Sequence, residues 1–314
     1  MPLKRLSAAF AARSSPTRAA LWMIVAAAFF ASMSALIRKL SEDLHVLEIV
    51  FFRNLAGFAF MVPWLVRTGV RGLRTDNTRL YLGRSLIGLM SMFLWFTALT
   101  MMPLAEATAL AFTAPLFATV AAVLILGETV RARRWTATIV GFIGAMIVLR
   151  PGFGSVGLPE VLVLLSAAIQ GLNIVVVRQL SRVEDPNAVV TYMTLYILPF
   201  SLVPALFVWT NPPPHTWIWI ALLGLCGTAG HQAFTRAFAI SDASALLAFD
   251  YAKLPFVALI AWFAFGEAPD IWTWLGAAVI VGATVYIAHR EATIARRAAA
   301  AKSSAPSAAH AAHD

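Results

Sequence analysis

The sequence has little charge for its length. Asp, Glu, Lys and Arg make up 12% of the 314 residues, against 60% for the hydrophobic residues, whereas a soluble domain carries about 25% charged residues. A water-soluble fold of this size could not hide so much apolar surface, and the mean hydropathy of +0.79 agrees. We therefore expect lipid to be the solvent of most of this chain.

Several kinds of functional site are also missing from the sequence. Cys226 is the only cysteine, which excludes an internal disulfide and a site with several cysteine ligands. The six histidines show no HExxH or comparable ligand spacing, and no Walker phosphate loop is present. We expect no metal site, no cofactor and no ATP-driven step.

The net charge of +9 could suggest a nucleic-acid partner, but the positions of the basic residues do not. They fall in short clusters between apolar runs, which is typical of cytoplasmic loops rather than of a folded basic face. We expect membrane lipid and a small-molecule substrate as partners, and no nucleic acid.

Ten apolar runs have the length of a membrane-spanning helix, which needs roughly 20 mainly apolar residues. Runs this long and continuous leave no alternative to helices in lipid. The spans are expected near residues 19–37, 46–66, 80–101, 103–127, 134–149, 158–177, 188–209, 216–237, 243–266 and 271–288. The predicted fold is an all-α membrane protein of ten transmembrane helices.

The basic residues predict the orientation of this bundle. If the N-terminus is cytoplasmic, only three basic residues lie on the outer side: Arg38, Lys39 and Arg150. Eighteen lie on the inner side: Lys4, Arg5, Arg13, Arg18, Arg67, Arg71, Arg74, Arg79, Arg131, Arg133, Arg134, Arg178, Arg182, Arg236, Arg290, Arg296, Arg297 and Lys302. This bias predicts a multi-pass protein of a bacterial inner membrane with both termini in the cytoplasm.

An internal repeat relates the two halves of the chain. Phe117, Gly127-Glu128 and Trp135 recur 139 residues later as Phe256, Gly266-Glu267 and Trp274. Phe96-Thr97 recurs as Phe234-Thr235, and Arg38-Lys39-Leu40-Ser41 recurs as Arg178-Gln179-Leu180-Ser181. Each half therefore holds five spans, and an odd number makes the second half enter the membrane inverted.

The domain boundaries follow from this repeat. We expect a basic cytoplasmic tail over 1–18, a first repeat over 19–151 and a second repeat over 152–289. Residues 290–314 form an alanine-rich cytoplasmic tail, predicted to be disordered or loosely helical.

The motifs inside the repeats carry a family resemblance. They are Phe96-Thr97-Ala98-Leu99, Pro103-Leu104-Ala105-Glu106-Ala107, Pro115-Leu116-Phe117, Leu126-Gly127-Glu128, Phe265-Gly266-Glu267 and Gly276-Ala277-Ala278. Together they resemble the EamA domain of the drug/metabolite transporter superfamily. The resemblance implies a five-plus-five inverted repeat around a central cavity, and transport of amino acids, nucleotide-like compounds, cofactors or drugs by proton coupling or exchange.

A weaker resemblance within the family points to carriers of riboflavin or S-adenosylmethionine. It rests on Phe51-Phe52-Arg53-Asn54, on Arg134-Trp135 with the glycine-rich segment that follows, and on Tyr251 through Gly266-Glu267-Ala268-Pro269-Asp270.

Asp250 and Lys253 are the main candidates for substrate or proton binding. They lie seven and ten residues into the ninth predicted span, and the i,i+3 spacing puts them on one helix face. A charge at this depth normally faces a cavity or a partner, so they either neutralise each other or line a binding site. Tyr251 and Pro255 interrupt the same segment, and we expect Pro255, like Pro115 in the first repeat, to free a backbone carbonyl beside a wet cavity.

Arg53 and Asn54 are candidates in the second span. A guanidinium can bind a carboxylate or a phosphate through two parallel hydrogen bonds, and the alternative is an internal salt bridge to Glu48 or Asp250. Arg84 lies only five residues from the end of the third predicted span, so we expect it to extend to the lipid headgroups.

Three further spans carry polar side chains at helical spacing. His231 and Gln232 give the eighth span a polar stripe, and His231 could relay protons. Gln170 and Asn173 share a face of the sixth span and would line the cavity or bond across a helix pair. Tyr192 could offer its ring and hydroxyl to a ligand or pack in the core. In the same eighth span, the i,i+3 spacing of Gly224, Gly227 and Gly230 predicts close helix contact.

Glu128 and Glu267 end the fourth and ninth predicted spans on opposite sides of the membrane. That placement suggests a structural or gating role, shared with Pro115 and Pro255, rather than a place in the substrate site.

The predicted function is secondary active transport of a small polar or ring-containing metabolite by alternating access. The metabolite would be a vitamin or cofactor such as riboflavin or S-adenosylmethionine, or an amino-acid-like compound, with proton coupling through Asp250 or His231. The protein would act as a monomer or homodimer. The alternatives are a membrane-embedded enzyme and an accessory subunit without transport, but the polar residues do not gather into a catalytic set.

Overall fold

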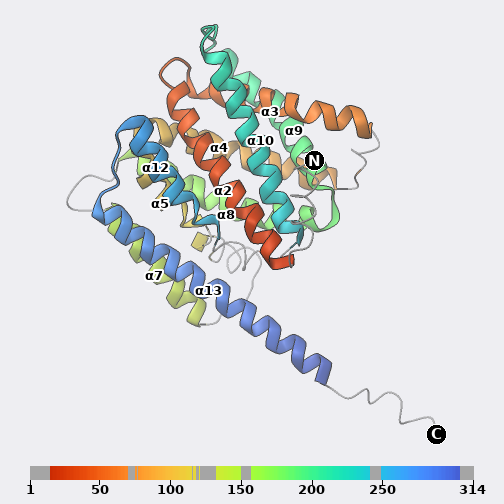
Figure 1. The fold of residues 1–314 in the computed structure, drawn as a ribbon, viewed down its shortest axis with the longest axis vertical. Helices are drawn as coiled ribbons and strands as arrows, with labels where there is room; N and C mark the ends of the chain where they lie inside the picture. Colours follow the sequence, from red (N-terminus) through yellow and green to blue (C-terminus); the bar gives the residue numbers. More distant parts are fainter. Residues whose placement is uncertain are drawn as a thin grey trace, which may run out of the picture.

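The computed structural model describes residues 15–69, 75, 77–114, 116–117, 120, 132–149, 157–240 and 249–304. In these residues it is all-helical, and ten helices are assigned (Figure 1). The first half contributes α2 (Ser15–Leu40), α3 (Val46–Thr68), α4 (Thr78–Met101), α5 (Leu104–Ala111) and α7 (Ala132–Leu149). The second half contributes α8 (Leu158–Val183), α9 (Pro186–Leu206), α10 (Thr216–Ile240), α12 (Lys253–Phe265) and α13 (Ile271–Ser304).

Four of the described helices are long and apolar enough to cross a membrane, by length and composition: α2 from Arg18, α3, α4 and α9. Shorter apolar stretches lie in α7, α8, α12 and α13. These helices fall on the predicted spans, which confirms the helical membrane fold. The predicted short turn between the third and fourth spans is also present, because α4 ends at Met101 and α5 begins at Leu104.

Pro115 and Glu128, for which a structural or gating role is predicted, lie outside the described residues. In the C-terminal segment, α13 continues to Ser304, so residues 290–304 adopt the helical one of the two predicted alternatives. Alanine, which is frequent here, has the highest helix propensity.

Local sequence signals explain where several helices begin and end. Glu48 and His45 form a capping box at the start of α3, and the Asp185 side chain accepts from the backbone of Asn187 and Ala188 at the start of α9. Gly266 ends α12 at φ +67°, in the left-handed region that a residue without Cβ adopts readily. These caps satisfy backbone groups that the first and last turns leave unpaired.

The packing of the helices reproduces the inverted repeat. In sequence order, α2, α3, α4, α5 and α7 correspond to α8, α9, α10, α12 and α13. Accordingly, α2 packs on α10 as α8 packs on α4, and α2 contacts α12 as α8 contacts α5. The pairs α3 with α9 and α7 with α13 each join equivalent helices, and Figure 1 shows α7 lying beside α13. The two halves therefore form one bundle, each supplying the partners of the other.

Small residues allow the closest helix contacts. A Cβ on Gly224 would lie 2.8 Å from the backbone carbon of Ala56, and one on Gly276 would lie 2.7 Å from the carbonyl oxygen of Gly144. The predicted close contact through the glycines of α10 is confirmed, because Gly224 and Gly227 meet α3 and Gly230 meets the Phe30 ring of α2.

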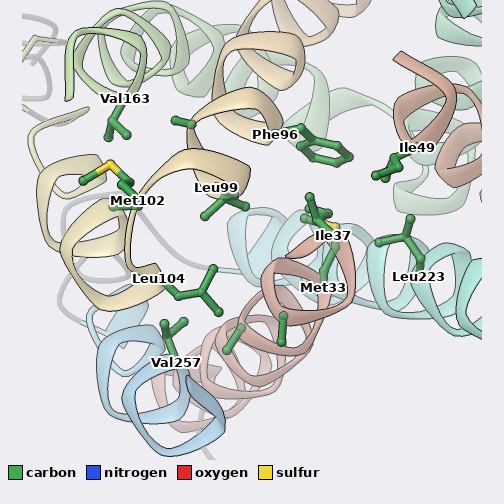
Figure 2. Close-up of a cluster of buried hydrophobic side chains, with 14 of the residues drawn as sticks. Met33, Ile37, Ile49, Phe96, Leu99, Met102, Leu104, Val163, Leu223 and Val257 are labelled. Atoms are coloured by element: carbon green, nitrogen blue, oxygen red, sulfur yellow. The ribbon is translucent and has the colours of Figure 1, made fainter. Parts of the chain in front are cut away.

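Buried apolar side chains from both halves fill the space between these helices. Figure 2 shows Met33 and Ile37 of α2 between Leu99 of α4 and Leu223 of α10, in one cluster with Phe96. This packed core positions the cavity described next.

Candidate functional site

A cavity of about 190 Å³ lies between the two repeats. Helices α2, α4, α8, α9, α10 and α12 and the segment after α5 contribute to its wall. Its lining includes a group of aromatic rings and a group of charged or amide side chains, among smaller and aliphatic residues.

The aromatic lining comes from both halves of the chain: Phe30, Trp95, Phe96, Phe112, Phe234 and Tyr251. Phe112 meets the Tyr251 ring edge-on with centroids 4.8 Å apart. Such walls suit a flat ring, because aromatic faces and edges pack favourably against one another. Trp95 therefore lies where a planar ligand could stack.

Asp250 and Lys253 both line the cavity, which is one of the two placements that the sequence left open. They are separated by a turn at Tyr251 and Ala252, and Lys253 is the first residue of α12. Among the described residues no ion pair joins them. The Lys253 ammonium instead lies 5.9 Å from the Trp95 ring centroid and 5.6 Å from that of Phe112, which is cation–π range.

Pro255 does not interrupt the helix of the ninth span in the expected way. Pro255 is the third residue of α12 and is exposed. A proline in the first helical turn removes an N–H that has no intrahelical acceptor, so it frees no carbonyl within the helix. The interruption comes from the start of α12 itself.

Gln170 and Asn173 of α8 both line the cavity, and the Asn173 Nδ2 donates to the Gln170 Oε1 at 3.2 Å. His231 of α10 also lines it and meets the Phe30 ring edge-on at 5.1 Å. The amide pair and the imidazole thus belong to the cavity wall.

Arg84 of α4 is the site residue that sequence reasoning missed. It lines the cavity, and its side chain is 3% exposed, so it does not extend to the headgroups. Gly88 and Ser91 line the cavity from the same helix, and the spacing i, i+4, i+7 places all three on one face. That stripe of one charged and two small residues was the signal available in the sequence.

Arg53 and Asn54 lie in the core of α3 and are not in the cavity lining. Arg53 Nη1 donates to Asn54 Oδ1 at 2.9 Å, and the guanidinium packs against Gly227. Neither predicted salt bridge of Arg53 forms in the described structure. Glu48 instead accepts from the Thr210 backbone N–H at 2.7 Å.

Gln232 and Tyr192 also lie away from the cavity lining. The Gln232 Nε2 donates to the Met61 sulfur at 3.1 Å. The Tyr192 ring stacks on Tyr81 at 4.4 Å and on Tyr196 at 5.6 Å. Both side chains fill contacts between helices.

Glu267 follows α12 at the end of the bundle where α2 ends. Its carboxylate pairs with Arg38 at 2.9 Å and accepts from the Leu104 N–H at 3.1 Å. Arg38 also donates to the Met102 carbonyl at 2.6 Å. Glu267 thereby joins the second repeat to two elements of the first, while its repeat equivalent, Glu128, lies outside the described residues.

An inverted repeat of helices around a central cavity is typical of membrane transporters. The model of the EamA-like transporter family matches residues 17–150 and again residues 158–288. The chain belongs to this family, and it is a transporter and not an enzyme.

Curated relatives cover nearly the whole chain. A riboflavin transporter of Vibrio cholerae is 34% identical over 90% of this chain and 96% of its own length. An S-adenosylmethionine uptake transporter of Rickettsia prowazekii is 30% identical over 86% of this chain and 92% of its own. A solved crystal structure shares the fold, with a TM-score of 0.62 at 20% identity over 89% of this chain and 99% of that one.

Proposed function

We propose that this protein moves a flat, ring-containing vitamin or cofactor across a bacterial inner membrane, with riboflavin as the first candidate. The observation that carries the proposal is the cavity between the repeats, which is lined by six aromatic residues together with Arg84, Asn173 and Lys253. Rings and a few placed polar groups are the usual lining of a small-molecule site. The relative named as a riboflavin transporter supports the choice of substrate.

Transport would follow alternating access around this cavity, because inverted repeats let one half rock against the other. The end of the bundle that carries Arg38 and Glu267 would face the periplasm. The end that carries Arg79 and Arg236 would face the cytoplasm, in line with the distribution of basic residues.

Proton coupling would run through Asp250. This carboxylate lines the cavity without an ion pair to Lys253 in the part of the chain that the structure describes. A carboxylate that faces a cavity within the membrane is a suitable proton carrier. His231 is the second candidate for this role.

S-adenosylmethionine is the second candidate substrate. The same Asp250 carboxylate would attract a cationic sulfonium group, and one relative is named for uptake of this compound.

The test is uptake of labelled riboflavin and labelled S-adenosylmethionine by the purified chain in liposomes, with empty liposomes as the control. Saturable uptake of riboflavin, inhibited by unlabelled riboflavin, is the expected result. Uptake of S-adenosylmethionine alone would favour the second candidate, and uptake of neither would contradict the proposal.

A further inference from the structure

Arg84 is a buried cation with unsatisfied hydrogen-bond donors. Its Nε and Nη1 atoms are shielded from solvent and make no hydrogen bond, and no carboxylate pairs with it within the described residues. A buried guanidinium in this condition is costly because nothing replaces the water it has lost.

Asn173 has a hydrogen-bond acceptor that lacks a donor. Its Oδ1 atom is buried and accepts no hydrogen bond, while its Nδ2 is used by Gln170. The side chain is 8% exposed and lines the same cavity as Arg84. The cavity lining therefore includes N–H donors of Arg84 that lack an acceptor and an oxygen of Asn173 that lacks a donor.

The fold brings Asn173 to the helix that carries Arg84. Asn173 of α8 approaches α4 at Gly88, where an added Cβ would lie 3.6 Å from the Asn173 Nδ2. Gly88 follows Arg84 by one helical turn on the same face, a separation of about 5–6 Å between such positions. Ser91 and Ser166 hold α4 and α8 together one turn further on, with their hydroxyl oxygens 3.0 Å apart.

We propose that Arg84 and Asn173 together recognise a heterocycle edge that carries a hydrogen-bond acceptor next to an N–H donor. The inference rests on the proposed function and names the part of the substrate that this site reads. Arg84 donates to the ring carbonyl or ring nitrogen, and Asn173 Oδ1 accepts from the adjacent N–H. The imide edge of a flavin and the amino-pyrimidine edge of adenine both have this arrangement.

The pair discriminates against simple anions. A carboxylate would satisfy Arg84 but would set an acceptor against the Asn173 Oδ1, which would remain without a donor. A site with buried polar groups rejects ligands that leave one of them unpaired. The aromatic residues of the cavity lining then pack on the face of the ring, while Arg84 and Asn173 form hydrogen bonds with its edge.

The test measures binding to the purified full chain by equilibrium dialysis with two matched ligand pairs. The first is riboflavin and 3-methylriboflavin, and the second is adenosine and N6,N6-dimethyladenosine. Methylation removes the N–H and leaves the acceptor. We expect it to weaken binding by about tenfold, the usual loss for one hydrogen bond, in whichever pair the protein binds. The ligand pair whose affinity falls on methylation shows whether the site recognises a flavin or an adenine.

Variants locate the effect at these residues. Asn173→Leu should bind the parent and methylated ligands equally, because the acceptor for the N–H is gone. Arg84→Met should bind the parent about 30-fold more weakly, since a charged donor contributes more. Arg79→Met is the matched control, an exposed arginine on the same helix outside the cavity, and should bind as the wild type does.

Equal affinity of the wild type for parent and methylated ligand would overturn this inference while leaving transport intact. Failure to bind riboflavin and adenosine alike would also overturn this inference, whereas the proposed function is decided by the uptake of riboflavin and S-adenosylmethionine into liposomes. The wild-type comparison uses no variant, so it decides the question even if Arg84→Met does not fold.

Discussion

Arg38, near the end of α2, and Glu267, directly after α12, form an ion pair of 2.9 Å that links the two repeats. Both side chains are about one-quarter to one-fifth exposed, at 26% and 21%. Through Glu267 the link extends to the first N–H of α5, and through Arg38 to the last carbonyls of α4. In alternating access, a link of this kind between the repeats would hold one end of the bundle closed.

Glu267→Gln should therefore shift the protein toward opening at that end. The change removes the charge but keeps an acceptor for Leu104. Its effect is measured as labelling of a cysteine placed at Ser34, which lines the cavity, by an impermeant maleimide added from the periplasmic side. We expect labelling to be about tenfold faster. Loss of the charge pair destabilises the closed state of this end, and the population of the open state rises accordingly.

The matched control is Glu42→Gln. Glu42 pairs with Lys39 near the same end, but both side chains are exposed and belong to one segment, so the pair contributes little. Equal labelling rates for both variants and the parent would show that Arg38 and Glu267 do not hold this end closed.

The contact between α7 and α13 should depend on two glycines. A Cβ on Gly276 would meet the Gly144 carbonyl at 2.7 Å, so Gly276→Val forces the helices apart and should destabilise the protein by about 1–3 kcal/mol. The melting temperature of the purified protein measures this. Gly282→Val, on the same helix with no neighbour near its Cβ position, should leave it unchanged, and equal effects of the two changes would contradict the close packing.

Much of this fold could be predicted from the sequence because lipid restricts the options. The apolar runs predict the helices, and the offset between Gly127-Glu128 and Gly266-Glu267 predicts two halves of five spans. The start of α12 at Lys253 could not be predicted in this way, since an apolar run does not reveal where a helix breaks within the membrane.

The site was harder to predict, because a sequence does not say which helix faces another. Arg84 and Arg53 are both arginines a few residues inside a span, yet the first lines the cavity and the second packs on Gly227. The difference comes from the partners: α4 meets α8 along the face of Gly88 and Ser91, whereas α3 meets α10 at Gly224 and Gly227. Asp250, Lys253 and His231 line the cavity, and their roles in binding or proton coupling stay predictions.

Asp250→Asn should abolish the response of uptake to a pH step across the liposome membrane. An amide cannot take up the proton that the carboxylate carries, so the variant should exchange substrate without being driven by the gradient. Flux with an imposed pH step, wild type beside Asp250→Asn, measures this. Coupling that persists in the variant would move the proton site to His231, and a wild type that ignores the pH step would exclude proton coupling.

The predicted orientation can be tested at two exposed positions. A cysteine at Thr78, at the start of α4, should be labelled only from the cytoplasm, and one at Pro214, before α10, only from the periplasm. Both are measured with an impermeant reagent on intact cells and on inverted vesicles. Labelling of either site from the opposite side would contradict the assigned orientation.

The most direct test of the central claim is an experimental structure of the full chain determined with riboflavin bound. The account predicts density for the ring system in the cavity between the repeats, with its face against Trp95 or Phe112 and its imide edge toward Arg84 and Asn173. Riboflavin density elsewhere on the protein, with this cavity empty, would contradict the account.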